Sequence, residues 1–285
     1  MSRIAYVNGR YLPLSGAKVA IEDRGFQFAD GVYEVCEVRG GRLVDERRHV
    51  ARLDRSLNEI RIARPMSAAA LSIVLRETVR RNRVRDGIVY LQITRGVARR
   101  DFSFPQANTP PSVVVTARSN DLARLERMAE EGIAVITLPD IRWQRVDIKS
   151  VALLPNVLAK QTARDRGARE AWLVDAQGRV TEGASSNAWI VSRDGTLITH
   201  PLGRDILPGV TRSVVIDVIK AQGLVFEERG FSVEEAYAAR EAFVTSASQI
   251  VLPVVSIDGR PVGNGAPGLI ATALRRDYHA HAELT

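Results

Sequence analysis

The apolar residues of this chain recur with two different periods, and this alternation limits the possible folds most strongly. Residues 4–12 and 32–44 form short extended stretches around glycine turns, which predicts β-hairpins. Residues 45–63 and 67–82 place apolar side chains three and four positions apart, which predicts two helices, with Ser67 as the N-cap of the second. No regular strand–helix–strand repeat follows, so the pattern indicates an α+β or α/β fold and does not specify a doubly wound sheet.

The second half of the chain alternates strands and helices more densely. Its Ser232 and Glu235 have the spacing of a capping box. At 285 residues the chain is long enough for two domains. We expect them to span residues 1–120 and 121–285, joined by the polar stretch 119–128. The other predicted elements are strands at 87–96, 110–119, 132–138, 170–175 and 187–192, and helices at 155–167, 208–223 and 271–281.

Composition excludes several classes of protein. The single cysteine, Cys36, rules out an internal disulfide framework and a cysteine-clustered metal site, and the four histidines are scattered, so no metal is expected. No signal-like apolar segment begins the chain and no run of about eighteen apolar residues occurs, which predicts a cytoplasmic protein without a membrane partner. The formal charge of +7 has no like-charged block, so a nucleic-acid partner is not expected.

Only four of the 40 basic residues are lysines, and one of them lacks an evident structural role. Lys18 lies in a polar loop, Lys160 lies in a predicted helix, and Lys220 complements a helix dipole near Gly223. Lys149 lies immediately before an apolar run. Because burial disfavours a charged ammonium, its amine is a candidate for holding an aldehyde as a Schiff base. The alternatives are a lysine whose head reaches solvent from a strand end, or one that pairs with Asp147.

An aldehyde cofactor such as pyridoxal phosphate needs two further partners. Its ring nitrogen requires a charged or hydrogen-bonding group, and its phosphate requires backbone N–H groups with an arginine. Glu182, in a predicted polar turn, is a candidate for the first role, although an ordinary turn residue explains it equally well. Residues 207–213 present Gly209, Val210 and Thr211 at a helix start, which would suit an anion or would simply begin a helix well.

Seven sequence blocks, in order, resemble the class IV (fold type IV) pyridoxal-phosphate aminotransferases. The likeness covers nearly the whole chain and is greatest to the D-amino-acid aminotransferases. It implies an α+β fold with a small N-terminal α/β domain and a larger C-terminal domain built on a mixed, barrel-like sheet. The blocks are EDRGFQFADGVYEV, HVARL, ITRGVARRDFSFP, IRWQRVDIKSVALLPNVLAKQ, VTEGASSN, LPGVTR and FVTSAS.

The resemblance assigns a role to each candidate residue. Lys149 would hold the cofactor and then act as acid and base, while Glu182 would pair with the ring nitrogen, with Arg142 as a partner of Glu182. Ser185 would join the polar shell, although turn capping explains it equally well. Tyr33 would line the substrate side, and Leu207 would pack on the ring; core packing is the alternative for both. The phosphate would be bound by Arg52, Gly209, Val210, Thr211, Ser246 and Ala247.

One candidate has a second interpretation, and one position departs from the family. Arg52 falls on the polar side of its predicted helix, so a solvated surface arginine remains the alternative. Typical D-amino-acid aminotransferases hold the substrate carboxylate with an arginine–any–histidine trio, and here the trio reads Arg100–Asp101–Phe102. Losing the histidine should cost about 1 kcal/mol of carboxylate binding. It would also leave room for an apolar substrate group.

The resemblance implies a transaminase that moves the amino group of D-alanine or D-glutamate to 2-oxoglutarate or pyruvate. Rivals within the family are a branched-chain L-amino-acid aminotransferase, an (R)-amine transaminase and an aminodeoxychorismate lyase. A homodimer is expected by the same resemblance. From a different class, a nucleic-acid-binding protein would have to use the arginines between residues 48 and 61.

Overall fold

The computed structural model describes residues 3–285, which form two compact units. The first contains the described residues up to Asp121 together with Ile148–Ala152 and Glu283–Thr285, and the second contains Leu122–Asp147 and Leu153–Ala282. Each unit is described by itself. The predicted boundary near residue 120 stays a prediction, and the contacts place the segment with Lys149 in the first unit.

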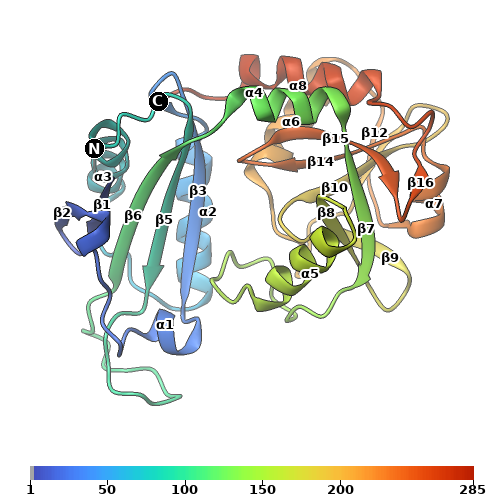
Figure 1. Ribbon diagram of the computed structural model, residues 1–285. Helices are drawn as coiled ribbons and strands as arrows, with labels where there is room; N and C mark the ends of the chain where they lie inside the picture. Colours follow the sequence, from blue (N-terminus) through green and yellow to red (C-terminus); the bar gives the residue numbers. More distant parts are fainter. Residues whose placement is uncertain (1–2) are drawn as a thin grey trace. The chain divides into compact units, whose positions relative to one another are not determined.

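The first unit is an antiparallel sheet with two long helices packed on it (Figure 1). The strand order is β2-β1-β6-β5-β3-β4, and leucines from both helices join the same buried cluster as the core-facing residues of the sheet. Its elements are β1 (Ile4–Val7), β2 (Arg10–Pro13), a 3₁₀ turn (Leu14–Gly16), α1 (Arg24–Phe28), β3 (Gly31–Arg39), β4 (Arg42–Leu43), α2 (Glu46–Glu59), α3 (Ala68–Arg81), β5 (Gly87–Thr94) and β6 (Ser112–Ser119).

The second unit is built on a larger mixed sheet. The strand order is β12-β11-β10-β14-β15-β7-β8-β9-β13, with β16 on β15, and the pairs β7–β8, β7–β15 and β11–β12 are parallel. Its elements are α4 (Leu122–Glu131), β7 (Ile133–Pro139), α5 (Leu154–Asp165), β8 (Glu170–Val174), β9 (Arg179–Gly183), β10 (Asn187–Val191), β11 (Leu197–Thr199), α6 (Val210–Ala221), β12 (Phe226–Glu228), β13 (Phe231–Ser232), α7 (Val233–Ala238), β14 (Glu241–Ser246), β15 (Ile250–Ile257), β16 (Arg260–Pro261) and α8 (Leu269–His281).

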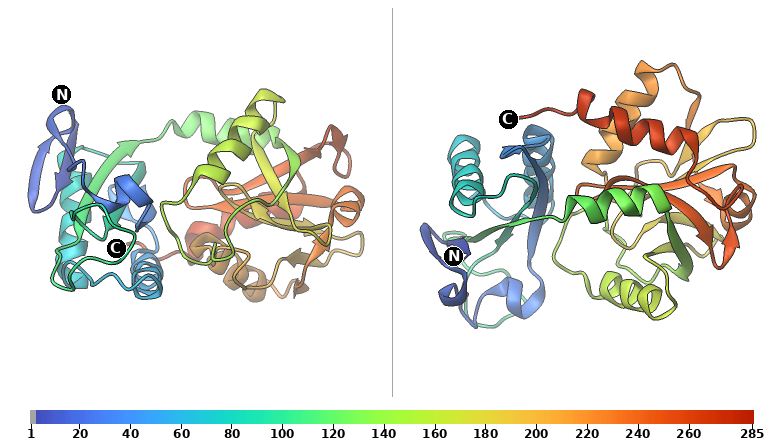
Figure 2. Two further views of the ribbon diagram at one scale, coloured as in Figure 1. Left: turned by 90° about the horizontal axis from the view of Figure 1, so that it is seen from below. Right: turned by 45° about the horizontal axis from the view of Figure 1, so that its top comes forward.

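Helices lie on opposite sides of this second sheet. Helix α8 packs on α6, β14 and β15, whereas α5 packs on β7 and β8, as Figures 1 and 2 show. Strand β9 also contacts β10, so the sheet curls on itself. The core inside the curl contains the fully buried rings of Trp172 and Phe231 in edge-to-face contact. This curled sheet holds the loops that carry most of the candidate site.

Local sequence signals predicted several features correctly. Ser67 accepts a hydrogen bond from the N–H of Ala70, and Ser232 forms the full capping box with Glu235. The polar stretch 119–128 is largely helical, because α4 covers it from Leu122 onward and packs against β15. Between residues 3 and 285, no helix has the length and apolar character needed to span a bilayer.

Candidate active site

Lys149 lies beside strand β3 in the first unit. Its carbonyl accepts a 3.0 Å hydrogen bond from the N–H of Tyr33, and its own N–H donates to Ser56 Oγ at 3.2 Å. The Nζ atom lies 4.2 Å from the centroid of the Tyr33 ring, and the side chain is only partly exposed. The backbone bonds fix the segment, and the ring holds the amine by a cation–π contact. The structure thus brings two predicted site residues, Lys149 and Tyr33, into contact.

Asp147, the alternative partner of Lys149, pairs with Arg145. Arg145 donates to both carboxylate oxygens of Asp147, at 3.0 Å and 3.2 Å. Asp147 is buried, so this pair satisfies a carboxylate that would otherwise be costly to bury.

The surface interpretation of Arg52 is wrong, because its guanidinium is buried. Arg52 Nε donates to Glu34 Oε1 at 2.8 Å and Nη2 to Glu34 Oε2 at 2.7 Å, which is a bidentate pair. His49 Nδ1 lies 2.8 Å from the same Glu34 Oε2. Burial alone would raise the pKa of Glu34, but the charge and hydrogen bonds of Arg52 outweigh it and lower the pKa to about 2. Burial lowers the pKa of His49.

The sequence does not predict Glu34 and His49 as site residues, although the alternation of β3 indicates that Glu34 is buried. Val32, Cys36 and Val38 all face the core of the first unit, and Glu34 shares their side of the strand because side chains alternate. A buried acid requires a partner, and Arg52 supplies it. Glu34 therefore orients the guanidinium of Arg52.

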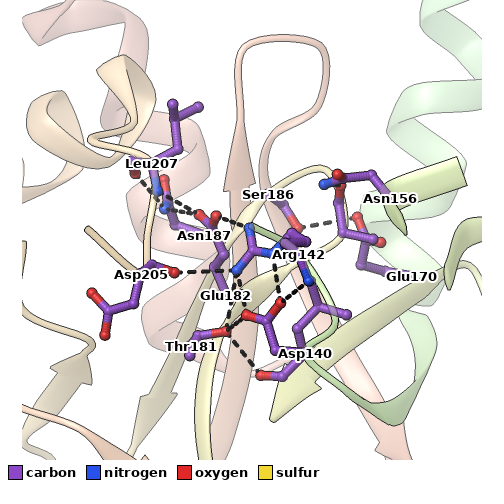
Figure 3. Close-up of polar contacts among 12 residues, drawn as sticks. Asp140, Arg142, Asn156, Glu170, Thr181, Glu182, Ser186, Asn187, Asp205 and Leu207 are labelled. Atoms are coloured by element: carbon purple, nitrogen blue, oxygen red, sulfur yellow. Dashed lines mark hydrogen bonds and ion pairs between the residues drawn. The ribbon is translucent and has the colours of Figure 1, made fainter. Parts of the chain in front are cut away.

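Glu182 lies in strand β9 and not in a turn as predicted. Pairing of Gly183 with Trp172 of β8 continues the strand through Gly183, and Glu182 is buried in the second unit. Its carboxylate receives hydrogen bonds from Arg142 Nη1, from Asn187 Nδ2 at 2.9 Å and from the N–H of Leu207 at 3.1 Å (Figure 3). The predicted partnership of Arg142 with Glu182 is confirmed.

Asn187, which sequence reasoning missed, connects three parts of this cluster. Its amide donates to Glu182 and, at 2.9 Å, to the carbonyl of Leu207. A Cβ on Gly209 would lie 2.0 Å from Asn187 Oδ1, so a larger residue at position 209 would displace the Asn187 side chain. Asn187 thereby holds the loop of Leu207 against Glu182.

Helix α6 begins beside this cluster. Gly209 is its N-cap and has no side chain with which to accept a first-turn N–H group. A helix start carries N–H groups without partners in the helix and the positive end of the helix dipole, and this combination suits a phosphate. Thr211 and Val210 are the buried first-turn residues. Pairing of Asn187 with Thr245 places Ser246 and Ala247 at the same end of the sheet.

Three further predicted residues, Ser185, Arg100 and Phe102, make contacts within their own units. Ser185 is exposed and donates to Glu170 Oε2 at 2.7 Å, so its cofactor role stays a prediction. Arg100 lies in the first unit with its guanidinium 4.5 Å from the centroid of Phe28. Phe102 lies 5.6 Å from the same ring, centroid to centroid, and is 87% exposed. Their substrate roles stay predictions as well.

The chain matches the family model of amino-transferase class IV over residues 31–257. It belongs to this family. It is 44% identical to D-alanine aminotransferase of Bacillus licheniformis over 261 residues, which cover 92% of this chain and 90% of that protein. It is 39% identical to D-alanine aminotransferase of Staphylococcus aureus over 279 residues, which cover 98% and 97% of the two chains.

Solved structures of the same family share the fold. The Escherichia coli branched-chain amino acid aminotransferase superimposes with a TM-score of 0.88 at 25% identity, over 98% of this chain and 94% of that one. A second branched-chain enzyme, solved with pyridoxamine 5'-phosphate, gives 0.89 at 27% identity, over 98% and 93%. The predicted fold type IV architecture, aminotransferase activity and pyridoxal phosphate dependence are confirmed.

Proposed function

We propose that this aminotransferase moves the amino group of D-amino acids, such as D-alanine and D-glutamate, to 2-oxo acids, such as 2-oxoglutarate and pyruvate. The observation that carries the proposal is the 44% identity to a D-alanine aminotransferase along nearly the whole chain. The solved branched-chain enzymes share the fold at 25–27% identity, which gives them less weight for substrate choice.

The second unit fits a phosphorylated pyridine ring. Its helix start at Gly209 offers first-turn N–H groups without a side-chain cap from Gly209 itself, and Glu182 is a buried carboxylate beside it. Val210, Thr211, Ser246 and Ala247 would bind the phosphate with Arg52, and Leu207 would pack on the ring. When bound, pyridoxal phosphate withdraws electrons from the substrate carbon that carries the amino group.

The residues of this chain would then divide the work. Lys149 would carry the proton between the substrate α-carbon and the cofactor, and Tyr33 would orient its amine through the ring contact. Glu182 would hold the proton on the ring nitrogen, since an adjacent carboxylate favours a positive charge. Arg100 would bind the substrate carboxylate, and Phe102 would offer an apolar wall in place of the family histidine.

A paired donor assay tests the substrate class. The purified chain is incubated with D-alanine and 2-oxoglutarate, and pyruvate is measured with lactate dehydrogenase; L-leucine is tested in parallel through its own keto acid. We expect turnover of D-alanine with 2-oxoglutarate and of D-glutamate with pyruvate, and little turnover of L-leucine. Keto acid formed only from L-leucine would refute the D-specific proposal, and turnover only of a primary amine would favour the (R)-amine alternative.

Lys149 has a clean test because the chain holds only four lysines. Borohydride reduction should fix the cofactor on the peptide that contains Lys149. Lys149→Ala should abolish the yellow colour and the turnover, whereas Lys220→Ala, in the last turn of α6, should leave both intact. A label on another lysine would overturn the assignment.

We also infer a homodimer. Large apolar side chains of the first unit, Ile21, Phe26 and Phe102, are 80%, 73% and 87% exposed, which is typical of a surface that another chain covers. Light scattering of the purified protein should give twice the mass of 31.3 kDa. A mass of one chain would refute the dimer. The cytoplasmic location stays a prediction.

A further inference from the structure

Glu182 belongs to a buried cluster of three charged groups that lies wholly within the second unit. Arg142 stands between two carboxylates: it bonds Glu182 through Nη1 and Asp140 through Nε and Nη2, at 2.9 Å and 2.7 Å (Figure 3). The side chains of Arg142, Glu182 and Asp140 are 5%, 6% and 14% exposed. Two carboxylates and one guanidinium leave the cluster with one net negative charge.

The geometry divides the charge of Arg142 unequally. Asp140 accepts two hydrogen bonds from the guanidinium and a third, at 3.1 Å, from the backbone N–H of Arg142. Glu182 accepts a hydrogen bond from one guanidinium nitrogen, Nη1. Thr181 Oγ1 lies 2.9 Å from Asp140 Oδ2, which fixes that carboxylate further. Burial would raise the pKa of Asp140, but the hydrogen bonds and charge of Arg142 outweigh it and lower the pKa, so Asp140 stays ionised at neutral pH.

Asp205 also contacts Arg142, but the carboxylate of Asp205 does not take part in this contact. It reaches the guanidinium with its backbone carbonyl, at 3.2 Å from Nη2, and its carboxylate points away in Figure 3. That carboxylate lies 3.3 Å from His200 Nε2 instead. Asp140 is therefore the group positioned to offset the guanidinium.

We propose that Asp140 is a positioning residue that neutralises Arg142 and so leaves one negative charge on Glu182 for the protonated ring nitrogen of the cofactor. The inference rests on the proposed role of Glu182. Without Asp140, the guanidinium would cancel the charge of Glu182, and a positive ring nitrogen would lose its partner. The ring would then bind with its nitrogen unprotonated and withdraw electrons less strongly.

The test compares two ligands that differ only at the ring nitrogen. Pyridoxamine 5'-phosphate and its 1-deaza analogue, in which carbon replaces that nitrogen, are titrated calorimetrically into the cofactor-free full-length chain. Neither ligand carries an aldehyde, so neither links to Lys149. The ratio of their dissociation constants reports the charge that the site offers to the nitrogen and cancels general effects on folding.

Two single variants change the net charge of the cluster, and a double variant and a control leave it unchanged. Asp140→Asn makes it neutral and should reduce the preference for the nitrogen-containing ligand about tenfold or more, the size of one pKa unit. Arg142→Gln makes the cluster more negative and should keep or raise the preference. The double variant restores one negative charge and should return within about threefold of the wild type. Asp175→Asn removes the same kind of charge from an aspartate–arginine pair outside the cluster, that of Asp175 with Arg179, and serves as the matched control, with an unchanged ratio.

The outcomes separate the inference from the proposed function. A wild-type ratio near one would refute the role of Glu182 and the inference with it. A wild-type preference that Asp140→Asn retains, or equal loss of affinity for both ligands, would refute only the role of Asp140. If Asp140→Asn does not fold, Arg142→Gln provides the test. A reduced preference for the nitrogen-containing ligand in Arg142→Gln would refute the role of Asp140, because this variant makes the cluster more negative.

Discussion

Replacing Glu34 by glutamine should destabilise the first unit by about 3 kcal/mol at neutral pH. The carboxylate is fully buried against Arg52, and its pKa falls from 4.5 to about 2. That difference corresponds to about 3 kcal/mol of folding free energy. The change also leaves the charge of Arg52 buried without its anion, for which losses of about 3–5 kcal/mol are usual.

The pH dependence has a definite sign. Because folding lowers the pKa of Glu34, its contribution is complete above about pH 4.5 and disappears as the pH falls toward 2. The difference in unfolding free energy between wild type and Glu34→Gln should therefore shrink through this window. Using the difference removes the titration of the other carboxylates, which is common to both proteins.

Hydrogen exchange read by mass spectrometry can assign the loss to the first unit. Peptides from β3 and β5 should exchange faster in Glu34→Gln, and peptides from β14 should not. Glu77→Gln is the matched control, because arginines 80 and 81 also lower the pKa of Glu77 to about 2, but at the surface. It should leave exchange unchanged. A loss below about 1 kcal/mol in Glu34→Gln, or a pH-independent loss, would refute the argument.

Three further changes have defined outcomes. Gly209→Ala places a Cβ 2.0 Å from Asn187 Oδ1, so thermal unfolding should show a free energy of unfolding lower by about 1–3 kcal/mol. The variant should also lose the cofactor faster on dialysis. Ser232→Ala removes the capping box of α7 and should cost about 1 kcal/mol in urea unfolding. Deleting Glu283–Thr285 removes both backbone bonds between Thr285 and Leu43, so amides 42–46 should exchange faster; unchanged exchange would contradict the pairing.

Signals that depend on a few neighbouring residues were predictable from the sequence. The caps at Ser67 and Ser232 and the helix start at Gly209 follow from residues within one turn, and the structure contains all three. The sequence predicts a turn at Glu182 because the strand that contains it is short and polar. Its strand conformation depends on the pairing of β9 with β8, in which Gly183 lies opposite Trp172, and β13, about fifty residues away, pairs with the start of β9 at Arg179 and Val180.

The charged partners were less predictable for a related reason. Helical periodicity places Arg52 opposite the apolar residues of α2, and that pattern alone indicates solvent exposure. Only the carboxylate of Glu34, eighteen positions earlier and on the core side of β3, makes its burial favourable. The pairing of Arg142 with Glu182 spans forty positions and depends on β7 and β9 lying on either side of β8. Periodicity shows which side of an element is apolar, but it does not identify an ion pair that buries a charged residue from the polar side. An acidic residue that shares the core side of a strand, as Glu34 does, indicates where such a pair can form.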